Sequence, residues 1–94
     1  MNVRFTWDRA KSRANVRKHG IAFADAARIF DGPTVERTDD RFAYGERRVY
    51  AIGLVGLREV TVIYADRGDE AYHIISAWRA EPHERRYFWQ HVDD

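Results

Sequence analysis

Residues 72–87 read YHIISAWRAEPHERRY, and this stretch contains the change from strand to helix around which the chain is organised. Its first half, residues 72–78, is rich in the β-branched and aromatic residues that are typical of a strand. Pro82 then suits the first turn of a helix, because the amide hydrogen that proline lacks would have no partner there. The sequence therefore places Arg79 at a strand end beside Trp78, where a fixed cation is suited to bind an anion.

Three more strands are predicted upstream of this stretch. The four strand ranges are 34–38, 47–54, 58–65 and 71–78. The connections at 55–57 and 66–69 have hairpin-turn chemistry, and turns this short make the strands that they join antiparallel neighbours. A polar loop is expected over 39–45.

Helices are predicted on both sides of these strands. After a short β-like start at 5–7, Asp8 is a typical N-cap for a helix over 9–19, and Gly20 is a typical stop. That helix has a thin apolar face formed by Ala10, Ala14 and Val16. A second helix over 21–30 has an apolar stripe of Phe23, Ala26, Ala27 and Phe30, and the last helix covers 82–91.

This order predicts one α+β domain over 1–94, an antiparallel β-sheet with two N-terminal helices and one C-terminal helix packed on it. Ninety-four residues suffice for one core but not for two. Strict alternation along the last strand puts His73 on the face of Ala71, Ile75, Ala77 and Arg79, and puts Trp78 on the other. A lone strand histidine is more often packed than catalytic.

The composition excludes several kinds of site. There is no cysteine, so disulfides and thiolate metal sites are excluded. No apolar run approaches the roughly 20 residues that span a bilayer, and the start lacks the apolar stretch of a signal peptide. We therefore expect a cytoplasmic protein with no membrane contact. The four histidines are scattered, which indicates no metal site, and there is no phosphate-binding glycine loop.

Cations gather in the first third of the chain. The net charge is +1, yet residues 1–30 contain seven Lys or Arg and only two Asp. All but two of the 16 cations are arginine, whose planar fork suits phosphate. A solvated helix face explains this pattern, and a basic wall that meets the phosphates of a polyanion is the alternative.

Two short motifs combine cations with a titratable group. Lys18 and His19 close the first helix, where the helix dipole explains them, although His19 can also shuttle protons. Glu46 precedes two arginines at a strand start, where it is either part of a surface ion pair or a general base that faces the same cleft as Arg79. These motifs do not separate binding of a polyanion from its cleavage.

The succession of motifs resembles the BrnT toxin family over nearly the whole chain. It begins with Phe5-Thr6-Trp7-Asp8, Lys11, Asn15, Lys18-His19-Gly20-Ile21, Phe23, Ala26 and Phe30. It continues with Glu46-Arg47, Ile52-Gly53, Arg58, residues 60–64, Arg67-Gly68, Ile75-Ser76-Ala77, Ala80, Glu84-Arg85 and Tyr87.

The resemblance implies a type II toxin with a fold similar to RelE-family ribonucleases. Such toxins cleave RNA and inhibit translation, and no cofactor is expected. The implied partner is a BrnA-like antitoxin with a ribbon-helix-helix part, and the two proteins are expected to form a toxin–antitoxin heterotetramer. The toxin contacts operator DNA only indirectly, through the antitoxin. The alternative is a catalytically weak or inactive homologue that acts as a co-repressor of its own operon.

The resemblance also suggests roles for single residues. Metal-free RNA cleavage needs a base for the 2′-hydroxyl, an acid for the 5′-oxygen and fixed cations. The catalytic candidates are Glu46 or His19 as base, Lys18 or His19 as acid, and Arg79 with Arg48 as cations. The RNA-binding candidates are Arg58 and Arg67 for flanking phosphates, His73, and Trp78 or Tyr87 for stacking an unpaired base.

Trp78 departs from the family pattern. The family usually has Ile-Ser-x-Arg followed by a second cation, whereas Trp78 takes the place of the first cation here and only Arg79 remains. His73 stands where another cation is often found. Because an offset of one residue on a strand turns the side chain to the other face, Arg79 does not automatically replace the cation that Trp78 displaces.

Overall fold

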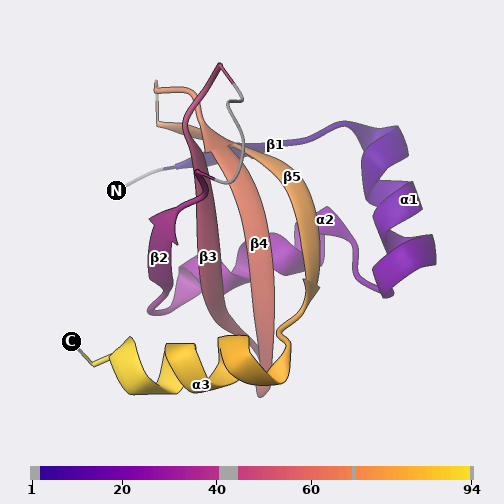
Figure 1. The fold of residues 1–94 in the computed structure, drawn as a ribbon. Coiled ribbons are helices and arrows are strands. Elements are labelled where there is room, and N and C mark those ends of the chain that lie inside the picture. The colour runs from indigo at the N-terminus through magenta and orange to yellow at the C-terminus, as the bar shows by residue number, and fades with distance from the viewer. Residues whose placement is uncertain (1–2, 41–44, 69, 94) are drawn as a thin grey trace.

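Five strands form one sheet in the computed structural model, which describes residues 3–40, 45–68 and 70–93. Their spatial order is β1 (Arg4–Thr6), β5 (Ala71–Arg79), β4 (Arg58–Asp66), β3 (Arg48–Val55) and β2 (Val35–Thr38) (Figure 1). Strands β2 to β5 are antiparallel neighbours, as predicted. Strand β1 instead pairs in parallel with β5, so the sheet is mixed and the prediction of an antiparallel sheet is wrong. No hairpin turn joins β1 to β5, and the direction of β1 is therefore free of that constraint.

Helix α1 (Arg9–His19) begins and ends where the sequence predicts. Oδ1 of Asp8 accepts a hydrogen bond from the backbone amide of Lys11 at 3.1 Å, and Gly20 has a φ of 76° in the left-handed region. The predicted apolar face of this helix is wrong, because Ala10, Ala14 and Val16 are all exposed.

A polar side chain, Asn15, docks α1 on the edge of β5 and is the one buried residue of that helix. Its Nδ2 donates hydrogen bonds to the carbonyl oxygens of Ala77 at 2.9 Å and Ile21 at 2.8 Å. Its Oδ1 accepts from the amide of Ala77 at 3.4 Å. The side-chain amide thus takes the place of a strand partner on the part of β5 beyond β1. This contact holds the C-terminal end of α1 beside the end of β5.

The second predicted helix, over 21–30, is divided in the structure. Helix α2 (Phe23–Ala26) is about one turn long and continues as the 3-10 helix η1 (Ala27–Asp31). Phe23 and Ile29 pack into the core against the sheet. Gly53 in β3 permits this close approach, because a Cβ atom at that position would lie 2.8 Å from Cβ of Ile29.

A β-bulge in β5 decides which side chains share a face of the sheet. Ile63 pairs with Ser76 but Tyr64 pairs with Ile74, so Ile75 is the extra residue of the bulge. The expected strict alternation is therefore wrong. His73 shares a face with Ser76 and Trp78, whereas Arg79 leaves β5 on the opposite face, together with Ala77 and Ile74.

We name the two sides of the sheet after the helices that cover them. The α2 face includes Val62 and Tyr64 and packs against α2 and η1. The α3 face includes Ile52, which packs against Phe88 of α3 (Pro82–His91), a helix with the predicted bounds. Helix α3 crosses only one end of the sheet (Figure 1), so the other end of the α3 face is not covered by it.

Two further expectations concern the whole chain. The loop predicted over 39–45 includes residues 41–44, which lie outside the described residues. Within the described ranges, no helix has both the length and the apolar character needed to cross a membrane.

Candidate functional site

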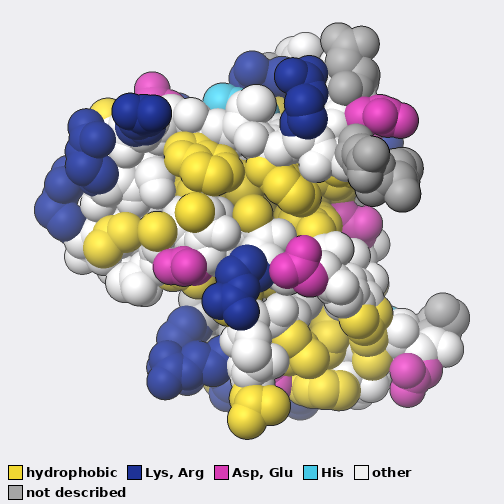
Figure 2. Space-filling model, turned by 180° about the vertical axis from the view of Figure 1, so that it is seen from behind, with side chains coloured by type: hydrophobic (Ala, Val, Ile, Leu, Met, Phe, Trp, Pro, Cys, Tyr) yellow, Lys and Arg dark blue, Asp and Glu magenta, His cyan; other side chains and the backbone are white. Residues whose placement is uncertain are grey.

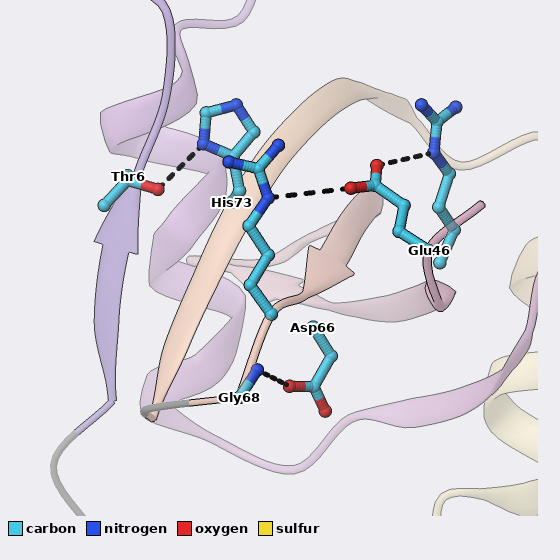
Figure 3. A network of polar contacts seen from close by, with 7 residues as sticks. Thr6, Glu46, Asp66, Gly68 and His73 are labelled. Carbon is cyan, nitrogen blue, oxygen red and sulfur yellow. Dashed lines mark hydrogen bonds and ion pairs between the residues drawn. The ribbon is translucent and has the colours of Figure 1, made fainter. Parts of the chain in front are cut away.

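Glu46 lies between two guanidinium groups near the start of β3. Its Oε2 accepts a hydrogen bond from Nε of Arg48 at 3.3 Å, and its Oε1 lies 3.6 Å from Nε of Arg67 (Figure 3). The turn that carries Arg67 is fixed by Asp66, whose Oδ1 accepts a hydrogen bond from the amide of Gly68 at 3.1 Å. Glu46 exposes 28% of its side chain, so the carboxylate is partly shielded but open to a substrate.

His73 joins this group from β5. Its Nδ1 lies 2.8 Å from the hydroxyl oxygen of Thr6 in β1, and this hydrogen bond orients the imidazole ring (Figure 3). Burial lowers the pKa of His73, the charge of Arg67 lowers it further, and the charge of Glu46 opposes both effects. His73 is therefore mostly neutral at pH 7, since its ordinary pKa is about 6.5. We call Glu46, Arg48, Arg67 and His73 the Glu46 cluster.

A second group of candidates meets at the other end of β5. A hollow of about 570 Å³, here called the Trp78 hollow, is lined by Lys18, His19, Ser76, Trp78, Arg79 and Glu81. His19 and Arg79 also line a neighbouring hollow of about 340 Å³, together with Arg58 and Arg28. Lys18 and His19 reach this place because Asn15 holds α1 against β5.

A buried carboxylate holds the indole of Trp78. Oε1 of Glu84, a residue that is 3% exposed, accepts three hydrogen bonds: from Nε1 of Trp78 at 3.0 Å, the hydroxyl of Thr61 at 3.2 Å and the amide of Glu81 at 2.7 Å. Burial raises the pKa of Glu84. The hydrogen bond to Glu84 fixes one edge of the indole ring. The ring of Trp78 also lines the Trp78 hollow, where its centroid lies 6.1 Å from the centroid of the His19 ring.

Tyr87 lies apart from both groups. It packs beside Ile52 on the α3 face, and the guanidinium carbon of Arg37 lies 5.0 Å from its ring centroid. The same guanidinium lies 5.2 Å from the ring of Tyr50, which meets Trp78 edge-on at 6.1 Å. A row of rings and one arginine therefore leads from Tyr87 to the Trp78 hollow.

The structure thus divides the sequence-based candidates between two places. Glu46, Arg48, Arg67 and His73 form one group. Lys18, His19, Trp78 and Arg79 form the other, with Arg58 next to it. His73 and Trp78 share the α3 face and are five residues apart, so at about 3.3 Å per residue the two places lie about 16 Å apart.

The two places differ in their chemistry. The Glu46 cluster combines a carboxylate, an imidazole and two guanidiniums, which are the groups that phosphodiester cleavage uses. The Trp78 hollow offers cations and a ring, which suit binding of phosphate and base. In the described parts of the chain, no group of three or more His, Cys, Asp or Glu side chains is placed to hold a metal ion.

Three positioning residues were not among the sequence-based candidates. Asn15 docks α1, Glu84 holds Trp78 and Thr6 orients His73. The sequence contains one usable signal for Glu84, because Glu81 and Glu84 have the spacing of a capping box at the start of α3. It contains no such signal for Thr6, whose partner is 67 positions away.

Comparisons with known proteins identify relatives of this chain. Residues 7–84 match the family described as the ribonuclease toxin, BrnT, of type II toxin–antitoxin systems. The fold is similar to the crystal structure of the Brucella abortus ribonuclease toxin, BrnT, with a TM-score of 0.63 and 30% sequence identity, covering 85% of this chain and 99% of that chain. A comparison with curated proteins gave no match. The family match covers most of the sequence and confirms the resemblance, so the chain belongs to the BrnT family of ribonuclease toxins of type II toxin–antitoxin systems.

Proposed function

We propose that this chain is an endoribonuclease toxin that cleaves RNA without a metal ion and so inhibits translation in the cytoplasm. The observation that carries this proposal is the position of Glu46 between Arg48 and Arg67, with His73 beside them. A base, a proton donor and fixed cations are the groups that such a cleavage requires. Ion pairs join Glu46 to Arg48 and Arg67, and His73 lies near enough for the charges of Glu46 and Arg67 to act on its pKa.

In the proposed reaction, Glu46 accepts the proton of a 2′-hydroxyl while the oxygen attacks the adjacent phosphorus. The bond from phosphorus to the 5′-oxygen breaks, and His73 gives a proton to that oxygen in the minor fraction of molecules in which its imidazole is protonated. The products are a 2′,3′-cyclic phosphate and a 5′-hydroxyl. Arg48 and Arg67 neutralise the charge that builds on the phosphoryl oxygens, and their ion pairs with Glu46 orient them in advance.

The Trp78 hollow binds another part of the RNA, away from the cleaved bond. The indole of Trp78 stacks an unpaired base, and Lys18, His19 and Arg79 contact its phosphate. Arg58, in the neighbouring hollow, contacts the next phosphate. In this arrangement Lys18, His19 and Arg79 act mainly in binding, because they lie about 16 Å from the Glu46 cluster along β5.

The family is of the type II toxin–antitoxin class, so the partner of this chain is an antitoxin. We propose that this antitoxin is BrnA-like, with a ribbon-helix-helix part, and that two copies of each chain form a heterotetramer. The toxin then contacts operator DNA only through the antitoxin. Light scattering on the purified complex tests the stoichiometry, and a mass other than that of two toxins and two antitoxins contradicts it.

The activity is tested with purified protein and single-stranded RNA in the presence of EDTA. We expect fragments that end in a cyclic phosphate, and no fragments from the Glu46→Gln form. Arg47→Gln is a matched control, because Arg47 exposes 64% of its side chain and its ion pair is with Asp66. Intact RNA with the wild-type chain contradicts the proposal, and cleavage that needs added Mg²⁺ contradicts metal independence.

A second candidate function is that of a catalytically weak homologue that acts with its antitoxin as a co-repressor. Trp78 favours this reading, since the indole stands where the family resemblance has a cation and is tied to Glu84. In that case growth continues when the chain is expressed without antitoxin, while the complex binds operator DNA in a salt-dependent way. A Trp78→Arg form that cleaves RNA faster than the wild type supports this reading, and an equal or slower rate contradicts it.

A further inference from the structure

A hollow on the α2 face is not used by the proposed reaction. It has a volume of about 530 Å³ and lies where the end of η1 meets side chains of β1, β5 and β2. Figure 2, which views the molecule from behind the view of Figure 1, shows hydrophobic side chains gathered at the surface of this side with carboxylates near them. We call it the aromatic hollow.

Three half-buried rings form the floor of the aromatic hollow. Phe5 stacks on Phe30 with ring centroids 5.2 Å apart, and Tyr72 meets the edge of Phe30 at 5.6 Å. Behind them, the ring of Tyr64 stacks on Tyr72 at 4.1 Å. The packing of these rings on one another fixes the shape of the floor before any ligand arrives.

Two carboxylates stand at the rim. Asp31 and Glu36 line the hollow and are both exposed, and no Lys or Arg is found among its described lining residues. Glu36 is fixed in place because its Oε1 accepts a hydrogen bond of 2.6 Å from the hydroxyl of Tyr64. This charge is opposite to that of the Glu46 cluster and the Trp78 hollow, so the aromatic hollow does not suit RNA phosphate.

We propose that the aromatic hollow is a docking site for the antitoxin, and that it receives an arginine or lysine side chain of the antitoxin together with an adjoining apolar residue. A cation over aromatic faces is attracted by the ring quadrupoles, and carboxylates at the rim add a direct ion pair. The hollow has room for a long basic side chain and a neighbour. The inference rests on the antitoxin partnership in the proposed function, and it does not depend on ribonuclease activity.

The aromatic hollow lies back to back with the pair formed by Thr6 and His73 on strands β1 and β5. Phe5 precedes Thr6 in β1, and Tyr72 precedes His73 in β5, with register pairs that put each neighbour on the opposite face. Strand β1 is the edge of the sheet. An antitoxin segment anchored in the hollow therefore has only this edge strand to pass in order to reach the His73 side.

The test is the affinity of the purified cognate antitoxin for the full chain, measured by calorimetry at two salt concentrations. The Asp31→Asn/Glu36→Gln form removes both rim charges, and Gln keeps the acceptor for Tyr64. The control, Asp40→Asn/Asp93→Asn, removes two exposed charges outside the hollow. We expect the rim form to raise Kd roughly tenfold or more and to weaken its salt dependence, while the control stays within about twofold of the wild type.

Other results overturn the proposal. A rim form that binds the antitoxin as tightly as the wild type shows that the hollow is not the docking site, provided that circular dichroism shows both forms folded. Self-association of the wild type that the rim form loses assigns the hollow to a second copy of this chain. If the wild type fails to cleave RNA while the rim form binds antitoxin weakly, the ribonuclease proposal fails and the docking proposal stands.

Discussion

The indole Nε1 of Trp78 donates a hydrogen bond to Oε1 of Glu84 over 3.0 Å. This contact links the Trp78 ring, which we propose stacks on an RNA base, with the first turn of α3. The same oxygen accepts from the hydroxyl of Thr61 in the buried sheet. One carboxylate therefore ties together a surface ring, a core strand and a helix start. If Trp78 stacks RNA as proposed, stability and RNA binding are coupled at this point.

Removal of the Glu84 carboxylate is predicted to destabilise the fold. Glu84→Ala leaves three donors without their acceptor, so the free energy of unfolding should fall by roughly 2–4 kcal/mol. Glu84→Gln keeps an acceptor oxygen at the same place and should lose clearly less. Urea unfolding measures both forms, and equal losses would show that the negative charge matters rather than the hydrogen bonds.

Removal of the Asn15 amide is predicted to release α1 from β5. Asn15→Ala loses its hydrogen bonds to Ala77 and Ile21, and the buried backbone groups lose their partner, which should cost about 2–3 kcal/mol. Arg13→Ala on the exposed side of the same helix is the control, and its change should stay within about 0.5 kcal/mol. Hydrogen exchange of the Ala77 amide should speed up in the first form only.

His73 is predicted to make stability depend on pH. Its pKa in the folded chain is lowered by burial and by Arg67, whereas in the unfolded chain it is about 6.5. The unfolded chain therefore binds more protons as the pH falls below about 6.5, and folding loses stability there. Unfolding in urea at neutral and mildly acidic pH should show the wild type losing stability relative to His73→Asn on acidification. A relative gain would mean that the folded pKa is raised.

A methyl group at Gly53 is predicted to push η1 away from the sheet. Gly53→Ala places its Cβ 2.8 Å from Cβ of Ile29, a contact that needs backbone movement and should cost about 1–3 kcal/mol. Gly32→Ala is the matched control, because a Cβ at Gly32 meets nothing within 4 Å. Thermal unfolding compares the two, and similar midpoints would contradict the tight contact between Gly53 and Ile29.

Local signals account for the parts of the fold that the sequence predicted. Asp8 and Gly20 bound α1, Pro82 begins α3, and short turns join β3, β4 and β5. The mixed sheet was not predicted because β1 pairs with a strand 67 positions later in the chain, and no local signal indicates such a pairing. The 3-10 continuation of α2 was not predicted either, and its residue Ile29 packs closely on Gly53 through a tertiary contact that no local signal indicates.

The sequence suggested the candidate residues, but it did not predict how they are grouped in space. The bulge at Ile75 moves His73 to the face of Trp78 and puts Arg79 on the other, against a strict alternation. Nothing in the residue types around Ile75 indicates an extra residue, since the bulge is defined by the partner strand. The position of Lys18 likewise depends on the docking of α1 against a strand some 60 positions later.

The most direct test of the central claim is the single-turnover rate of RNA cleavage at saturating protein for Glu46→Gln and Arg79→Ala. With chemistry at the Glu46 cluster, Glu46→Gln should lower this rate by about 10²–10⁴ with little change in the half-saturating concentration. Arg79→Ala should mainly raise that concentration and leave the saturated rate within about tenfold of the wild type. A Glu46→Gln form with a near wild-type rate, beside an Arg79→Ala form without activity at saturation, would place the chemistry in the Trp78 hollow and contradict the account.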